Sequence, residues 1–313
     1  MPNYLDDAQR DEIVRLRTSF TGRTEWPTWL LLIAVYAGWP ALMLLSPTLG
    51  VWPTTLLLIP LLILWMSLQH ELLHGHPTRR AWLNKMLGYA PFAVWYPYTL
   101  YRDTHLQHHC DEDLTIPGRD PESRYLSQTR WQQTGAPMRL LRWLDKTPPG
   151  RLVFGVPLAL YGLIVGEATR LQQGERQAWA MWVTHGFFLV LMFGFIERYS
   201  ALSSLHYLAF GTVPALAISM VRSYYEHRPS EQPQQRTVIN EASWPWGWLF
   251  LNLNLHLVHH DLPGLSWYHI PQVYRARREQ WLARSGGFLV PGYAELFRRH
   301  SFSPIDSPQH PYV

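Results

Sequence analysis

Four long stretches without a charged residue constrain the fold of this chain more than any other feature. They cover residues 28–45, 51–68, 178–196 and 201–221, and their lengths are 18, 18, 19 and 21 residues. A helix needs about 17–25 mainly apolar residues to cross the hydrocarbon core of a bilayer, so each stretch is long enough. Tryptophans typical of membrane interfaces lie near their ends: Trp26, Trp29, Trp52, Trp179 and Trp182. The sequence therefore predicts an all-α integral membrane protein with four transmembrane helices in two hairpins.

The basic residues are distributed unevenly around these stretches. Of 27 Lys and Arg residues, only Arg198 lies in the two short connections, and the other 26 lie before, between or after the hairpins. Cytoplasmic loops carry an excess of basic residues, so we expect both termini and the segments 69–177 and 222–313 at the cytoplasmic side of a bacterial inner membrane. Anionic membrane lipids account for the net charge of +4, and no nucleic-acid partner is expected.

One further apolar segment tests this topology. Residues 152–166 form a run of 15 uncharged residues, a length between a short span and an interfacial helix. If this run crossed the membrane, one of the histidine clusters described next would lie on the opposite side. We therefore predict that it is interfacial or re-entrant, and that residues 1–313 form a single domain.

Eight of the 15 histidines fall into three short clusters. They are His70 and His74 in HELLH, His105, His108 and His109 in HLQHH, and His256, His259 and His260 in HLVHH. Positions i, i+3 and i+4 share one face of a helix, so each cluster directs its imidazoles to one point. All three clusters lie on the predicted cytoplasmic side. We expect them to converge just below the membrane, in a cytosolic helical cap.

Eight imidazoles exceed what a single ion requires. Zinc sites use three or four protein ligands, whereas two iron ions accommodate eight or nine ligands and still leave a position for oxygen. The sequence therefore favours a dinuclear site, with His227 in YYEHRP as a ninth candidate ligand. Four nearby carboxylates are predicted to accept hydrogen bonds from the imidazoles: Glu71, Asp111, Glu226 and Asp261.

The remaining polar residues limit the other redox chemistry of the chain. The single cysteine, Cys110, excludes an intramolecular disulfide and a cysteine-ligated iron–sulfur cluster. No G-x-G-x-x-G motif is present, so a nicotinamide or flavin is expected on another protein. His269, His300 and His310 are predicted to lie at the surface.

The order HELLH, HLQHH, HLVHH around two predicted hairpins resembles the membrane fatty-acid desaturase and hydroxylase superfamily, over about residues 28–262. This resemblance implies two non-haem iron ions, O2 as co-substrate, and iron ligands at His70, His74, His105, His108, His109, His256, His259 and His260. His227 matches the additional ligand that precedes the third cluster. Some members have Asn four residues before it, where this chain has Ser223. No cytochrome b5-like H-P-G-G segment is present, which implies an external donor of the ferredoxin or rubredoxin type with its reductase.

The resemblance also implies the reaction class. Members oxidise unactivated C–H bonds, which favours desaturation of a fatty acyl chain or a related lipid-like substrate. Hydroxylation remains the alternative, because the ligand set does not distinguish the two outcomes.

Two functions outside this class also fit parts of the sequence. HELLH matches the zinc-peptidase helix H-E-x-x-H, with Glu71 as the general base, but a peptidase needs one more ligand rather than six. A metal transporter would use the histidines inside the spans, His185 and His206, as pathway ligands. Histidines in that position are more often hydrogen-bonded between helices.

Overall fold

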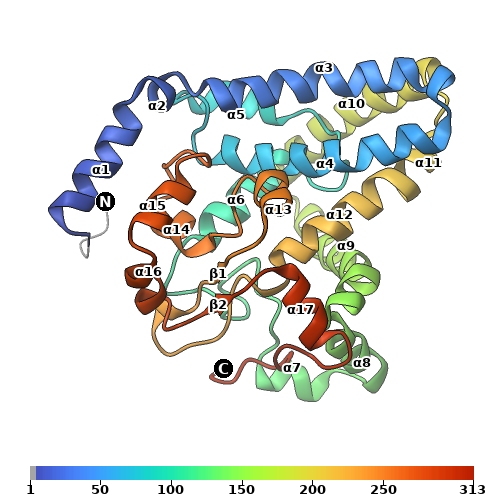
Figure 1. Cartoon of the computed structure of the whole chain (residues 1–313). Helices are drawn as coiled ribbons and strands as arrows, with labels where there is room; N and C mark the ends of the chain where they lie inside the picture. The colour runs from blue at the N-terminus through green and yellow to red at the C-terminus, as the bar shows by residue number, and fades with distance from the viewer. Residues whose placement is uncertain (1–4) are drawn as a thin grey trace. The chain divides into compact units, whose positions relative to one another are not determined.

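Helices account for nearly all the regular structure of the computed structural model, which describes residues 5–313 (Figure 1). Within these residues, the exception is a parallel pair of two-residue strands, β1 (Ile239–Asn240) and β2 (Leu289–Val290). Ile239 pairs with Leu289, and Asn240 pairs with Val290. The all-α prediction is confirmed.

The chain divides into two compact units, each built from segments that are distant in the sequence. The histidine unit comprises residues 5–26, 103–154 and 220–313. It contains α1 (Asp7–Thr18), α2 (Phe20–Thr24), α7 (Gln128–Gln133), α8 (Ala136–Asp145), η2 (Ser223–Tyr225), η3 (Pro233–Gln235), α13 (Trp244–Leu249), α14 (His256–Asp261), α15 (Ile270–Ala276), α16 (Arg278–Arg284) and α17 (Tyr293–His300).

The apolar unit comprises residues 27–102 and 155–219. It contains α3 (Trp26–Leu49), α4 (Val51–Leu73), α5 (Ala81–Gly88), α10 (Arg176–Tyr199), α11 (Ser204–His206) and the π-helix η1 (Tyr207–Thr212). Three helices contribute several residues to each unit: α6 (Tyr98–His108), α9 (Pro148–Gln172) and α12 (Val213–Arg222). Helix α3 contributes only its first residue, Trp26, to the histidine unit.

Five helical segments of the described chain are long and apolar enough to cross a membrane, whereas the sequence predicts four. They are Trp26–Leu49, Val51–Leu73, Pro148–Gln172, Arg176–Tyr199 and Ser204–Tyr225. The additional one is α9, whose 25 residues have a mean hydropathy of 1.7 in their most apolar window. Residues 152–166 are only the centre of this helix. The uncharged run underestimates the length of α9, because Arg151 and Glu167, which bound the run, lie within the helix.

Aromatic side chains form the packed centre of the apolar unit. Trp39 stacks on Phe92 with ring centroids 4.8 Å apart, and Trp65 meets Phe92 edge-on at 5.2 Å. Tyr207, which is fully buried, accepts a hydrogen bond from the Trp39 indole at 2.8 Å and donates one to the Phe92 carbonyl at 2.7 Å. These contacts join α3, α4 and η1 to the loop after α5, and they satisfy the polar ends of Trp39 and Tyr207.

Helix α4 is fixed closely against η1 and carries the first histidine cluster. A Cβ atom added to Gly211 of η1 would lie only 2.9 Å from Leu58 Cδ2 of α4, so the two backbones approach as small residues allow. Helix α4 continues past residue 68, where the apolar run ends, so that His70 lies in its last turn and His74 caps it. The packing of η1 therefore bears on the position of these two imidazoles.

In the histidine unit, a core of packed apolar side chains fixes the position of α14, which carries the third histidine cluster. In α14, Leu257 and Val258 are buried in this core with exposed fractions of 2% and 0%. The core also includes Leu5 and Ile13 from the N-terminal region and Trp281 from α16. Because its apolar positions are anchored in this way, α14 has a fixed rotation about its axis.

Candidate metal centre

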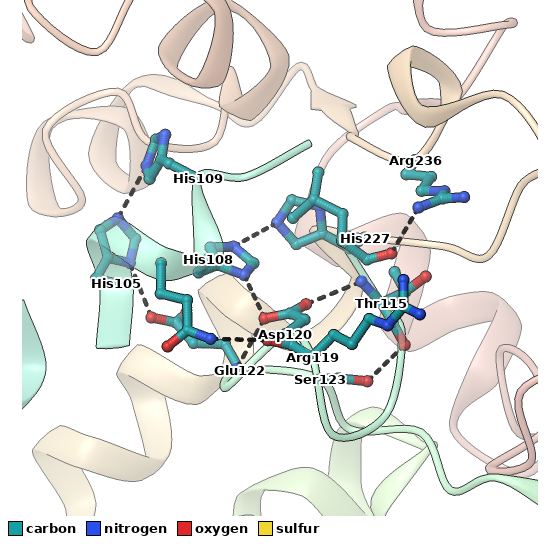
Figure 2. Close-up of polar contacts among 12 residues, drawn as sticks. His105, His108, His109, Thr115, Arg119, Asp120, Glu122, Ser123, His227 and Arg236 are labelled. Carbon is teal, nitrogen blue, oxygen red and sulfur yellow. Dashed lines mark hydrogen bonds and ion pairs between the residues drawn. The ribbon is translucent and has the colours of Figure 1, made fainter. Parts of the chain in front are cut away.

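The second histidine cluster lies at the end of α6, where a following loop supplies two carboxylates (Figure 2). His108 Nδ1 is 2.8 Å from Asp120 Oδ1, and His105 Nδ1 is 2.8 Å from Glu122 Oε1. A carboxylate accepts a hydrogen bond but does not donate one, so each Nδ1 carries the proton. In the neutral form of either ring, the lone pair therefore lies on Nε2 and points away from the carboxylate.

Three imidazoles of the histidine unit converge on one point. His105 and His109 belong to the second cluster and His259 to the third; we call them the three-histidine group. Their ligand nitrogens all lie within 4.8 Å of one another. His109 Nε2 is 3.1 Å from His105 Nε2 and 3.2 Å from His259 Nε2.

Four other imidazoles of the same unit converge on a second point. This four-histidine group consists of His108, His227, His256 and His260, whose ligand nitrogens also lie within 4.8 Å of one another. His227 Nε2 is 3.0 Å from His108 Nε2 and 3.1 Å from His256 Nε2, and His260 Nε2 is 3.2 Å from His256 Nε2. His227, which had the weakest support from sequence, thus lies among the others.

The second and third clusters each contribute to both groups. The i, i+4 pair of the second cluster, His105 and His109, lies in the three-histidine group, and His108 lies in the other. The third cluster is divided in the opposite way, because His256 and His260 lie in the four-histidine group and His259 in the three-histidine group.

The nitrogen spacing fits metal ions. With metal–nitrogen bonds of about 2.0–2.1 Å, two nitrogens bound to one ion at right angles lie about 3.0 Å apart. The shortest nitrogen–nitrogen distances in the two groups are 3.0–3.2 Å. Protonated imidazoles would repel at this distance, whereas lone pairs that converge on a cation would not. Each group therefore has the donor atoms and spacing of a nitrogen-rich metal site.

The pKa values of most of these histidines favour the neutral form that binds metals. Burial, together with unfavourable electrostatic interactions with His105 and His108, lowers the pKa of His109 to about 2. Burial likewise holds the pKa values of His227, His256 and His260 well below the usual range. These four rings are neutral at pH 7, as a metal ligand must be.

His108 behaves differently because of its carboxylate partners. Burial alone would lower its pKa, but the negative charges of Glu122 and Asp120 outweigh burial and raise the pKa to about 9. Without a metal ion, this ring carries a proton on each nitrogen at neutral pH. A metal ion at the four-histidine group would displace the Nε2 proton, and Asp120 would retain the Nδ1 proton.

Two of the carboxylates predicted from sequence lie beside the four-histidine group. Glu226 Oε1 is 3.7 Å from His256 Nδ1, and Asp111 Oδ1 is 3.7 Å from His260 Nδ1. A third, Asp261, forms a bidentate ion pair with Arg284 at 2.6 and 3.1 Å. This contact ties α14 to α16, a structural role that the sequence analysis did not predict.

Asp120 and Glu122 are the site residues that the sequence analysis missed. They lie 12 and 17 positions after the histidines that they contact, beyond any helical repeat. No spacing rule connects them to the cluster. The only available signal was the presence of acidic residues in a short loop after HLQHH, and this signal does not single them out.

The first cluster belongs to the apolar unit. The rings of His70 and His74 are 4.7 Å apart between centroids, and Glu71 Oε1 is 3.6 Å from His70 Nδ1. The two mid-span histidines have hydrogen-bond partners in the same unit. His185 Nε2 lies 2.7 Å from the Val94 carbonyl oxygen, so it donates to it, and His206 Nε2 lies 2.9 Å from Thr55 Oγ1.

These features define an all-helical protein with membrane-length helices and buried histidine clusters of the kind that bind metal ions. The sequence matches the fatty acid desaturase family over residues 47–289, which is most of the chain. The chain belongs to this family, as the resemblance of its histidine clusters implies, and the family indicates an oxidoreductase. A comparison with curated proteins finds no match.

Proposed function

We propose that this protein is an O2-dependent, non-haem di-iron oxidoreductase that desaturates a fatty acyl chain or a related lipid-like substrate. The observation that carries the proposal is the pair of imidazole groups in the histidine unit, with ligand nitrogens within 4.8 Å of one another in each. One group would hold each iron. Membership of the fatty acid desaturase family supports the reaction class.

The ligand set would include the first cluster as well. His70 and His74 are four residues apart at the end of α4, so they present an i, i+4 pair like those of the other clusters. The three-histidine group has room for further ligands on a five- or six-coordinate ion. We propose that His70 and His74 complete it, which gives five imidazoles around one iron and four around the other.

The protein residues supply geometry and protection to this centre. Iron ions bound there would provide O2 activation and the oxidising power for an unactivated C–H bond. Asp120 and Glu122 hold His108 and His105 in one tautomer, so that Nε2 faces the metal. The two groups are largely buried, with exposed fractions of 1–7% for His105, His108, His256, His259 and His260. Burial excludes water, which would otherwise compete for the open coordination positions.

The first experiment measures the metal content of the purified protein. Two iron atoms per chain, with magnetic coupling between them by Mössbauer spectroscopy, are expected. A single zinc per chain with no iron would contradict the proposal and favour the zinc-peptidase alternative based on HELLH. Metal transport into proteoliposomes, without oxidation of any substrate, would favour the transporter.

The second experiment identifies the product. The iron-loaded protein is incubated with acyl substrates, a ferredoxin or rubredoxin with its reductase, and ¹⁸O-labelled O2. Loss of two hydrogens without label is expected for desaturation, and incorporation of ¹⁸O indicates the alternative, hydroxylation. The difference depends on the position of the carbon radical relative to the oxidant, to within about an ångström.

We also propose that the metal centre faces the cytoplasm of a bacterial inner membrane. His109 and His259 meet within the histidine unit, yet three membrane-length segments separate them along the chain. Only an even number of crossings returns the chain to the same side, so at least one of the three does not span. We propose that this segment is α9, because Arg151 and Glu167 shorten its uncharged part to 15 residues.

The single cysteine offers a test of this orientation. Cys110 is exposed and lies next to His109. A membrane-impermeant maleimide is expected to label it in inside-out vesicles and not in intact spheroplasts, with Cys110→Ser as the control for background labelling. The reverse pattern would place the metal centre on the opposite side.

A further inference from the structure

Residues 303–313 lie along the loop that follows the second histidine cluster. The Leu126 amide donates to the Pro308 carbonyl at 2.9 Å, and the His310 amide donates to the Leu126 carbonyl at 2.8 Å. The Gln128 amide donates to the Val313 carbonyl at 2.9 Å. The segment is thus paired with the loop like an additional strand, although it is distant from it in sequence.

His310 is buried in this arrangement, with an exposed fraction of 3%, so the prediction that it lies at the surface is wrong. The Tyr312 amide lies 3.3 Å from His310 Nδ1 and donates to it, which places the ring proton on Nε2. His310 Nε2 lies 3.2 Å from Thr115 Oγ1. The imidazole therefore donates to the threonine hydroxyl.

Thr115 has a backbone conformation that a β-branched residue rarely adopts. Its φ of 69° lies in the left-handed region, so its neighbours must hold it in place. The Thr115 amide donates to Asp120 Oδ2 at 2.9 Å, and the Ser123 hydroxyl donates to the Thr115 carbonyl at 2.6 Å (Figure 2). His310 supplies the third contact, through the side chain.

Asp120 joins this loop to both imidazole groups. Its Oδ1 accepts from His108 Nδ1 at 2.8 Å and from the Glu122 amide at 2.8 Å. Glu122 in turn accepts from His105. A displacement of Thr115 would therefore move the carboxylate that orients His108, and to a smaller degree the one that orients His105.

A second contact from residues 303–313 reaches the same region. Asp306 accepts a hydrogen bond from Tyr125 and forms an ion pair with Lys146 at 2.8 Å. The Tyr125 hydroxyl also lies 3.4 Å from the carbonyl oxygen of His227. The segment thus supports two members of the four-histidine group, His108 through Thr115 and His227 through Tyr125.

We propose that His310 is a positioning residue for the metal centre, which holds Thr115 so that Asp120 orients His108 toward the ion of the four-histidine group. This inference rests on the metal centre of the proposed function. It assigns a role to a histidine 50 residues beyond the third cluster, whose side chain contacts Thr115, Tyr125 and Tyr312.

The test uses Co²⁺ binding to the metal-free protein, because the visible bands of Co²⁺ report its ligand geometry. His310→Phe retains the ring and its packing against Tyr125 but removes the donor. We expect one of the two Co²⁺ ions to bind about tenfold more weakly. Loss of a residue that supports a metal ligand typically weakens binding by about 10–100-fold, and this is the lower end of that range. His310→Gln retains an N–H donor and should restore most of the affinity and the wild-type spectrum.

Two further variants keep the test decisive. Thr115→Val removes only the hydroxyl and should reproduce the effect of His310→Phe, including in the case that His310→Phe fails to fold. His269→Phe is the matched control, a partly buried histidine of the same unit, and should bind both ions as the wild type does.

The outcomes separate this inference from the proposed function. If the wild type binds fewer than two Co²⁺ ions per chain, the proposed di-iron function fails. If the wild type binds two and both His310→Phe and Thr115→Val keep its affinities and spectrum, the role of His310 is refuted. Failure of His310→Gln to restore the spectrum would likewise refute it, in favour of a purely structural role.

Discussion

The two imidazole groups are built from the chain in different ways. All members of the four-histidine group lie in the histidine unit, and three of them have a carboxylate near Nδ1. In the three-histidine group, His105 Nδ1 contacts the carboxylate of Glu122, whose side chain is 37% exposed. Asp120, by contrast, is 5% exposed.

This difference indicates which ion is held more firmly. The four-histidine group is complete within one compact unit and is backed by carboxylates of which Asp120 and Glu226 are buried. The three-histidine group depends, in our proposal, on two more ligands from α4 of the apolar unit. We therefore expect a chelator to remove the ion of the three-histidine group first, and the following changes test that order.

The largest effect is expected from His108→Ala. It leaves three imidazoles in the four-histidine group and removes one of the three donors to the buried carboxylate of Asp120. Iron content should fall to about one per chain. Turnover should fall by more than about 100-fold, which exceeds the usual effect of losing a residue that only supports a metal ligand. Iron analysis and product formation measure this, with His269→Ala as the control; two retained irons and normal turnover would remove His108 from the ligand set.

His70→Ala should have a smaller effect on metal affinity, because four of five proposed ligands remain. We expect about 100-fold weaker binding of one ion, with the spectrum of the other unchanged. Co²⁺ titration of the metal-free protein measures both ions separately. His206→Ala, which removes a histidine bound to Thr55 in the same unit, is the control. A change at both ions, or at neither, would contradict the proposed assignment of His70.

The two carboxylates that the sequence analysis missed, Asp120 and Glu122, should contribute unequally to metal affinity. Asp120→Asn is expected to weaken the binding of one ion by about 10–100-fold, because a neutral amide does not stabilise the His108 imidazole as a carboxylate does. Glu122→Gln should have the smaller effect, because the more exposed side chain is partly replaced by water. Competition with a chelator measures both affinities, and an equal or reversed order would show that burial does not set the difference.

The smallest effect is expected from Gly211→Val, in η1 of the apolar unit. The new side chain would meet Leu58 of α4 at 2.9 Å or less, and overpacking of this kind costs about 1–3 kcal/mol of stability. The displaced α4 carries His70, so the ion of the three-histidine group should bind more weakly. The loss of affinity should be smaller than about tenfold. Gly186→Val is the matched control, because a Cβ there meets no atom within 4 Å. Equal losses in both variants would trace the effect to helix propensity instead.

The metal site was predictable where it depends on local periodicity. Spacings of three and four residues place imidazoles on one helix face, and this rule holds for His105 with His109 and for His256 with His260. It does not reveal that the second and third clusters are each divided between the two groups. That division depends on the rotation of each helix, which tertiary packing such as that of Val258 determines.

Features that depend on non-local contacts were not predictable. Asp120 reaches His108 through a loop, and His310 is buried by pairing with residues near Leu126. The extent of α9 was also missed, since an uncharged run marks the apolar part of a helix and not its ends. The helical secondary structure was predictable because long apolar runs indicate helices without any knowledge of tertiary contacts.

The division of α14 between the two groups limits how its sequence can change in length. Each residue of a helix turns by about 100° relative to the one before it. A single inserted residue between Leu257 and His259 would therefore move His259 and His260 away from their present directions while His256 stayed in place. Insertions and deletions should therefore be excluded within α14.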